Sequence, residues 1–253
     1  MISRRIAAAL KGQDWITIVI ELVLVIAGVL IALQLDQWNG ARADRAQEIQ
    51  FLVTVRDDIK QDITDVEGSI QALTAVLKFG NSTIASRGEK ACIDQCWSRI
   101  VAYFHASQWI DVQLNRATYD EIKRTGLPSD VLLKNDLTSY YNLSEQTTKI
   151  SADLPRYREL VRSIIPAATQ EHLWARCFRI QGRKQELIAD CAPPTNGENT
   201  REIIDRLRAN PEVESSLNYW LSTVSVVRRT LHNQVAESTS VVAALTDYVE
   251  KTR

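Results

Sequence analysis

Residues 15–35 read WITIVIELVLVIAGVLIALQL, and this stretch decides the fold of the chain. Glu21 is its only ionisable residue, and about 20 apolar residues are what a helix needs to cross the roughly 30 Å hydrocarbon core of a bilayer. A cleaved signal peptide has a shorter apolar core and a small-residue cleavage site, whereas this run continues into ALQLDQW. The sequence predicts an uncleaved transmembrane anchor over residues 15–38, with a helix buried in a soluble core as the alternative.

Both ends of the predicted span carry residues typical of a membrane interface. Trp15 and Trp38 bracket the run where indole rings lie among lipid headgroups, and Asn39 follows where water begins again. Basic residues before the span outnumber those shortly after it, which favours a cytoplasmic N-terminus over residues 1–14. These basic residues are Arg4, Arg5 and Lys11 before the span, and Arg42 and Arg45 after it.

All four cysteines follow the anchor, and an even number outside the cytosol suggests disulfides. We expect the two local pairs, Cys92 with Cys96 and Cys177 with Cys191, although four cysteines allow three pairings and cross-loop pairing is an alternative. A four-thiolate zinc site is the other alternative, but its usual short C-x2-C spacing is absent. Because disulfides form in an oxidising compartment, residues 39–253 are predicted to be a periplasmic domain of a single-pass protein in a bacterial inner membrane.

The composition favours a folded domain without nucleic-acid partners. Hydrophobic residues make up 45% of the chain and charged residues 24%, so disorder is not expected. The net charge of −1 provides no basic field that would attract nucleic acid.

Apolar residues recur at steps of three and four along most of the remaining chain, which indicates amphipathic helices. The first series, from Ile49 to Leu77, continues the anchor and is expected to stop at Gly80. The second, over 133–168, follows GLPSD, in which Ser129 or Asp130 can cap the helix, and Pro155 is expected to kink or restart it. The third covers 203–249, with a possible break at Pro211, and shorter helices are expected over 97–123.

The predicted fold class is all-α: one N-terminal transmembrane helix that continues into an elongated, coiled-coil-like, up-down four-helix bundle. No segment shows sustained period-two alternation, so no sheet is expected. The two cysteine-bearing loops would lie together at the end of the bundle far from the membrane. A parallel coiled-coil oligomer through the first helix is a compatible alternative.

No constellation of residues supports catalysis or a cofactor. His105, His172 and His232 are far apart in the sequence and fit no HExxH pattern, so we interpret them as structural or surface residues. The chain has neither a Gly-rich phosphate loop nor a G-x-S-x-G elbow. Four carboxylates are expected to form a solvated helix face: Asp57, Asp58, Asp62 and Asp65. The sequence predicts a protein that is not an enzyme and has no cofactor or metal.

Glu21 lies inside the predicted span, where an ionised carboxylate facing lipid costs a few kcal/mol. A hydrogen bond to another transmembrane helix would remove this cost, and Gly28 and Ala32 supply small residues one turn apart for close approach. The alternatives are a neutral Glu21 that snorkels to the interface, or proton or ion translocation with partner subunits. Glu21, Gly28, Ala32 and Gln34 are therefore the candidate transmembrane contact residues.

The stretch IELVLVIAGVLIALQLDQWN (20–39) resembles the N-terminal signature of a family of uncharacterised single-pass bacterial inner-membrane proteins. In that family a Glu-containing transmembrane helix ends in ALQ-x-x-x-WN. A second stretch, TYDEIKRTGL (118–127), resembles its mid-chain motif. Ile20 and Gly40 depart from the usual pattern, in which Gly precedes the Glu and Glu often follows WN. The residues that carry the resemblance are Glu21, Gly28, Gln34, Trp38, Asn39, Thr118, Tyr119, Gly126 and Tyr141.

The resemblance implies a location and a fold but no activity. The function predicted from the sequence is a non-catalytic, membrane-anchored periplasmic protein, an accessory or scaffold subunit of a membrane complex or of a homo-oligomer. Its partners would be the lipid bilayer and another transmembrane helix. The alternative is a periplasmic ligand-sensing four-helix bundle, although such receptors usually cross the membrane twice and end in a cytoplasmic output domain.

Overall fold

The computed structural model describes residues 15–88, 92, 96–195 and 199–252, with the side chains of residues 15–18 left out of the description. Contacts divide the chain into two units, Met1–Phe51 and Leu52–Arg253. The elements in chain order are α2 (Trp15–Ala85), the 3-10 turn η1 (Ser86–Gly88), α3 (Cys96–Ala106), α4 (Ala117–Thr125), α5 (Val131–Ile150), α6 (Arg156–Ile164), α7 (Ala167–Arg176), β1 (Phe178–Gln181), β2 (Lys184–Leu187), α8 (Thr200–Ala209) and α9 (Pro211–Thr252).

The described part of the first unit is entirely helical. Residues 15–51 all belong to α2, the helix of 71 residues that continues into the second unit as far as Ala85. This agrees with the prediction that the anchor helix runs on without interruption past its polar border.

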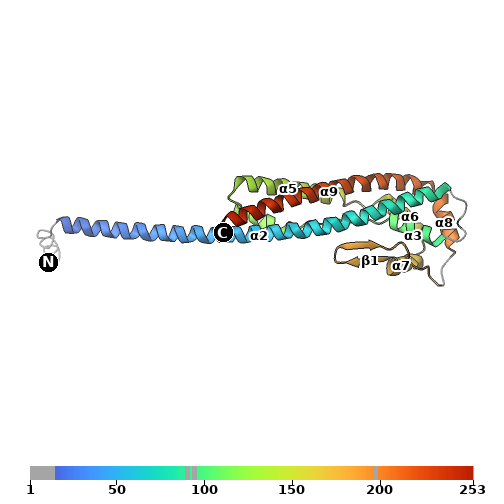
Figure 1. Ribbon diagram of the computed structural model, residues 1–253, viewed down its shortest axis with the longest axis horizontal. Coiled ribbons are helices and arrows are strands. Elements are labelled where there is room, and N and C mark those ends of the chain that lie inside the picture. The colour runs from blue at the N-terminus through green and yellow to red at the C-terminus, as the bar shows by residue number, and fades with distance from the viewer. Residues whose placement is uncertain (1–14, 89–91, 93–95, 196–198, 253) are drawn as a thin grey trace, which may run out of the picture. The chain divides into compact units, whose positions relative to one another are not determined.

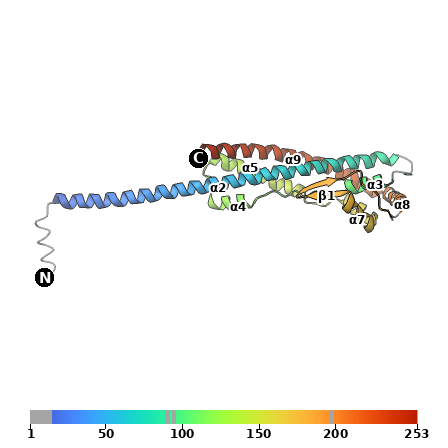
Figure 2. The ribbon, with the colours of Figure 1, turned by 60° about the horizontal axis from the view of Figure 1, so that its bottom comes forward.

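The second unit is built on the remainder of α2 and on α9, a helix of 42 residues that lies beside it (Figures 1 and 2). Helix α5 packs along the C-terminal part of α9, and α6 takes its place further toward the N-terminal end of α9. The core between these helices contains apolar residues at helical spacing, including Leu52, Ile59, Val66, Leu73, Leu137, Leu217, Val224, Leu231 and Leu245. The all-α prediction is confirmed, although among the described helices only α2 and α9 are longer than 20 residues, and shorter helices pack along them.

Proline and a capping aspartate set the helix borders where the sequence predicted them. Asp130 is the N-cap of α5, and its carboxylate accepts a hydrogen bond from Leu133 N at 2.9 Å. Pro155 restarts the chain at α6, and Pro211 is the first residue of α9. Pro166 separates α6 from α7, so the predicted helical series over 133–168 is divided into three helices.

Gly80 does not end the first helix, which contradicts the prediction from the sequence. Helix α2 continues through it to Ala85. A Cβ atom at position 80 would overlap the side chain of Leu221 on α9, with Leu221 Cδ1 only 2.9 Å away. Gly80 therefore allows α2 and α9 to pack closely. The polar residues Asn81 and Ser82 that follow it do not end the helix.

A small β-hairpin interrupts the helices, where the sequence analysis expected no sheet. Strands β1 and β2 pair antiparallel, with Phe178 opposite Leu187 and Gln181 opposite Lys184 (Figure 2). Gly182 takes a positive φ of 60° in the turn. Phe178 and Ile180 alternate with polar residues in β1, but β2 has Leu187 as its one apolar residue, so the hairpin shows no sustained alternation by which strands are recognised.

Candidate functional site

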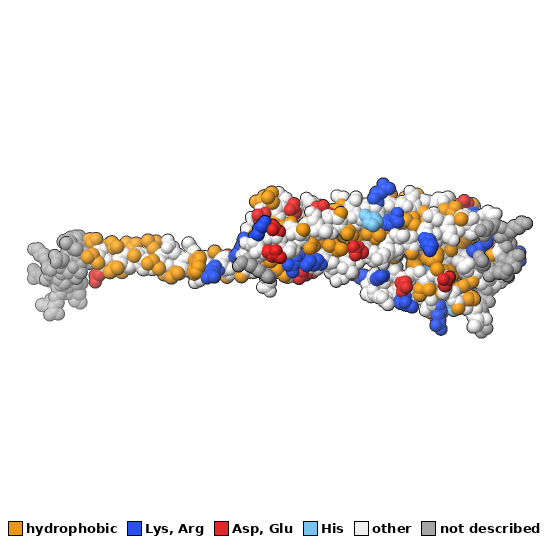
Figure 3. All heavy atoms as spheres, in the orientation of Figure 1, with side chains coloured by type: hydrophobic (Ala, Val, Ile, Leu, Met, Phe, Trp, Pro, Cys, Tyr) orange, Lys and Arg blue, Asp and Glu red, His pale blue; other side chains and the backbone are white. Residues whose placement is uncertain are grey.

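The apolar stretch of α2 exposes its large side chains to the surroundings, as the run of apolar atoms over this stretch shows in Figure 3. It is the single helix in the described part of the chain that is long and apolar enough to cross a membrane. Its most apolar window has a mean hydropathy of 2.3, and none of that window is buried. The alternative of a helix buried in a soluble core therefore fails for the described residues, and this helix is a candidate membrane span.

Three of the four candidate contact residues share one side of this helix. At 3.6 residues per turn, Glu21, Gly28 and Ala32 fall on one face and Gln34 lies away from it. All four are exposed, and a Cβ atom added to Gly28 would meet nothing within 4 Å. The face is open to close approach by another helix.

At the polar end of this stretch Trp38 is 57% exposed, and the guanidinium carbon of Arg42 lies 4.6 Å from its ring centroid. A cation over an indole one turn away suits the aromatic belt of a membrane interface. Asn39 is exposed beside it. The side chain of Trp15 and the basic residues Arg4, Arg5 and Lys11 lie outside the described residues.

In the second unit the predicted solvated face of carboxylates is wrong for Asp62, which is fully buried. One oxygen accepts from Asn115 Nδ2 at 2.7 Å, both accept from Asn115 N at 3.0 and 3.1 Å, and Tyr140 Oη donates at 3.3 Å. Burial raises the pKa of Asp62 to about 6, although these hydrogen bonds favour its charged form. Asp62 thus joins α2 to α5 and to the segment that precedes α4.

The residues of the second motif gather near this carboxylate. Thr118 Oγ1 donates to Asp58 Oδ2 at 2.6 Å, and the rings of Tyr119 and Tyr141 stack with centroids 3.9 Å apart. Gly126 ends α4 in the left-handed conformation, with φ of 81°. Thr118 thus joins α4 to α2, and the stacked tyrosines join α4 to α5, so these motif residues have a structural role.

Further along the same bundle, polar side chains join α5 to α9. Gln234 is fully buried, donates to Ser144 Oγ at 2.9 Å and accepts from Thr147 Oγ1 at 3.2 Å. Ser238, one turn further along α9, is 1% exposed. Sequence reasoning missed these residues, although Leu231, Gln234, Ser238 and Leu245 repeat at the helical spacing of a core face.

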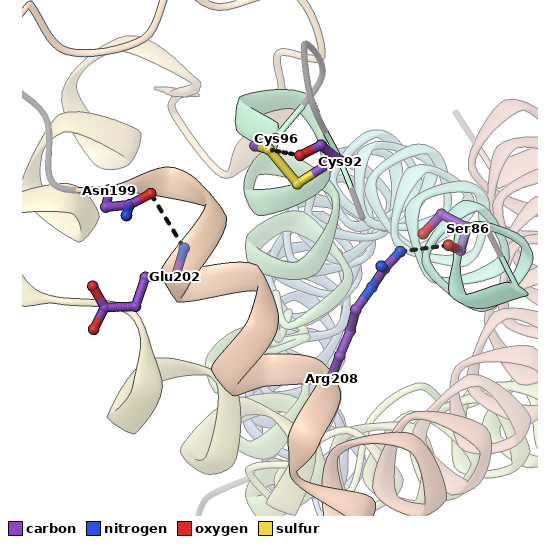
Figure 4. The surroundings of a disulfide bond; sticks show 6 residues. All are labelled: Ser86, Cys92, Cys96, Asn199, Glu202 and Arg208. Atoms are coloured by element: carbon purple, nitrogen blue, oxygen red, sulfur yellow. Dashed lines mark hydrogen bonds between the residues drawn. A yellow bond between two sulfur atoms is a disulfide. The ribbon is translucent and has the colours of Figure 1, made fainter. Parts of the chain in front are cut away.

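The disulfides are the two local pairs that the sequence predicted, Cys92 with Cys96 and Cys177 with Cys191. Trp97 Nε1 donates to the carbonyl of Cys191 at 2.7 Å, so the two cysteine-bearing loops lie together. Figure 4 shows the first pair near α8, whose Arg208 donates to Ser86 O at 2.6 Å. Among the residues that the structure describes, no group of histidines, cysteines and carboxylates could hold a metal ion.

The histidines have structural surroundings. His105 is fully buried with its Nε2 3.0 Å from Ile188 O, and burial lowers its pKa to about 4. His172 Nε2 lies 2.8 Å from Ala192 O, beside the ring of Trp97. His232 is exposed on α9.

A cavity of about 370 Å³ opens where the turn between α5 and α6 meets α9. Its walls are mainly apolar and aromatic, with Trp109 and Trp220 among them and Tyr219 at its rim, 77% exposed. Sequence reasoning did not find it, because its residues come from four separate segments. They include Leu73, Trp109, Ile110, Ile150, Ser151, Asp153, Leu154, Pro155, Arg156, Ser215, Tyr219, Trp220, Thr223 and Val227.

A family model described as "Family of unknown function (DUF6090)" matches residues 21–95, less than a third of the chain. The match begins at Glu21 and includes the end of the apolar stretch, whereas the second motif at 118–127 lies outside it. No curated protein and no solved structure matches this chain. The N-terminal region is therefore similar to a family for which no activity is described.

Proposed function

We propose that this protein is a non-catalytic, membrane-anchored helical protein, an accessory or scaffold subunit of a membrane complex or of a homo-oligomer. In this proposal residues 15–38 span a bacterial inner membrane, residues 1–14 are cytoplasmic and residues 39–253 are periplasmic. The observation that carries it is the exposed apolar stretch of α2, in which Glu21, the only ionisable residue of 15–35, shares a face with Gly28 and Ala32.

An ionised Glu21 side chain carries a free-energy cost in lipid. A carboxylate inside the hydrocarbon is stable when it is neutral or meets a hydrogen-bond donor, and small residues on the same face let a partner backbone approach. Two disulfides in the second unit suit an oxidising compartment, which supports the periplasmic side for that unit.

The test is native purification in mild detergent, followed by mass spectrometry of intact complexes. We expect the wild type to migrate as a stoichiometric oligomer or complex, and Glu21→Leu to insert in the membrane but lose the partner. Glu21→Gln, which keeps a hydrogen-bonding group, should retain much of the association, and Val23→Ala on the opposite face is the matched control. A lone wild-type monomer would contradict the proposal.

The topology is tested separately. Protease added outside spheroplasts should cleave within residues 39–253, and non-reducing peptide mapping should find no free thiol. Four free thiols would reverse the proposed orientation.

The cavity on α9 favours a second candidate function, the binding of a small ligand by the helical unit. Its volume of about 370 Å³ lies within the range of small-molecule sites. A monomer that co-purifies with a bound small molecule would favour this function over the scaffold.

A further inference from the structure

The cavity on α9 has a composition that selects for one class of ligand. Its aromatic walls come from Trp109, Trp220 and Tyr219. Trp109 Nε1 donates to Ser151 O and Trp220 Nε1 to Ala106 O, both at 2.9 Å. Since both indole N–H groups are bonded to the main chain, these rings can offer a ligand only carbon surface and π-electrons.

Three hydroxyl groups of the cavity donate to the main chain, whereas those of Ser216 and Tyr219 make no hydrogen bond within the described parts of the chain. Ser151 Oγ donates to Thr147 O, Ser215 Oγ to Glu212 O, and Thr223 Oγ1 to Tyr219 O, at 3.1–3.2 Å. A hydroxyl whose proton is committed in this way still has lone pairs to accept with. These three hydroxyls therefore favour a ligand that donates hydrogen bonds or carries positive charge, and the hydroxyls of Ser216 and Tyr219 can accept from such a ligand as well as donate.

The charges at the cavity favour a cation as well. Arg156 is the one basic residue among the described lining residues, and it bonds to Glu159 at 2.8 Å and lies 3.6 Å from Glu212. Asp153 is exposed and also lines the cavity, and it has no hydrogen bond or ion pair within the described parts of the chain. Glu159 and Glu212, which lie outside the lining, balance the charge of Arg156, so Asp153 is the lining charge that has no partner among the described residues.

We infer that this cavity binds an organic ammonium compound with an apolar body, held by the aromatic rings and by the carboxylate of Asp153. Ammonium groups placed over Trp and Tyr faces are attracted by the ring quadrupole, and quaternary ammonium ligands are recognised in this way. The inference deepens the ligand-binding function and is independent of the partner proposed for Glu21.

The probe is benzyltrimethylammonium, titrated into the detergent-solubilised full-length protein by isothermal calorimetry. Benzyl alcohol serves as the neutral comparison and benzoate as the anionic one. We expect saturable binding of the cation about tenfold tighter than of benzyl alcohol, with benzoate weakest. Asp153→Asn and Tyr219→Ala, which change exposed side chains, should each weaken cation binding about fivefold. Val226→Ala, an exposed apolar position on α9 outside the cavity lining, should leave it unchanged.

The possible failures are distinguishable. Equal binding of the cation and benzyl alcohol, or tighter binding of benzoate, would overturn the ligand class but leave a ligand-binding function. Absence of saturable binding for all three probes would overturn both. Cation binding that survives both variants would show a site elsewhere on the protein and would overturn the inference.

Discussion

The two units arrange polar and apolar side chains in opposite ways. Between residues 19 and 38 large apolar side chains are outside, with Leu24 65% exposed, whereas the unit from Leu52 onward buries polar residues such as Asp62 and Gln234. An apolar exterior is stable in lipid, and a buried polar group is stable when its hydrogen bonds are made. The difference fits the proposal that the apolar stretch lies in lipid and the unit from Leu52 onward in water.

The largest expected effect comes from making the exterior of the first unit polar. Arginine at the centre of a membrane helix costs about 2.5–3.5 kcal/mol by insertion scales. We expect Leu24→Arg combined with Ile31→Arg to remove the protein from the carbonate-resistant membrane fraction. The isomeric control, Leu24→Ile with Ile31→Leu, should remain in it. Retention of the double arginine variant would mean that this helix does not depend on lipid.

The buried carboxylate of the second unit predicts a pH-dependent stability. Burial raises the pKa of Asp62 from 3.8 to about 6, so the folded state binds this proton more tightly than the unfolded state. The contribution of protonated Asp62 to the free energy of unfolding is fully present below about pH 4, and it is lost as the pH rises through about 6. Over that window the wild type should lose up to about 3 kcal/mol relative to Asp62→Asn.

The measurement is chemical unfolding of the detergent-solubilised wild type and Asp62→Asn at several pH values. Only the difference between the two proteins reports on this carboxyl group, because other acids titrate in both. A difference that does not change between pH 4 and 7 would show that Asp62 has an ordinary pKa.

A pair of glycines tests the contrast in packing. Gly80 faces Leu221, while Gly28 faces open space. We expect Gly80→Val to lower the free energy of unfolding by about 1–3 kcal/mol, because it forces α2 and α9 apart. Gly28→Val should leave unfolding of the second unit unchanged and weaken only association, which native gels can measure. Equal stability of the wild type and the Gly80 variant would show that Leu221 moves aside freely.

The same contrast explains what the sequence could predict. The long apolar stretch, the helical periods, the prolines and the local cysteine pairs depend on residues near one another in the chain, and the structure agrees with them. Asp62, Gly80 and Gln234 were misjudged or missed because their roles depend on α5, α9 and the segment before α4. The periodicity did contain a clue, since Asp62 falls three residues after Ile59 and four before Val66, on the buried face. The cavity has no sequence signal, because tertiary packing assembles it.

The smallest expected effect concerns the charge that the hairpin brings near Asp62. Arg183 Nη1 donates to Gln113 O at 2.9 Å and lies 3.2 Å from Asp65 Oδ2, and its positive charge lowers the pKa of Asp62. Because Arg183 is half-exposed, Arg183→Ala should cost under about 1 kcal/mol. It should nevertheless move the titration of Asp62 to higher pH, which the same unfolding series can detect. Arg179→Ala, which breaks only an exposed pair with Glu186 within the hairpin, is the matched control. If the titration of Asp62 moves equally in both variants, the hairpin acts on Asp62 through packing. If it moves only in Arg183→Ala, the positive charge of Arg183 is what lowers the pKa of Asp62.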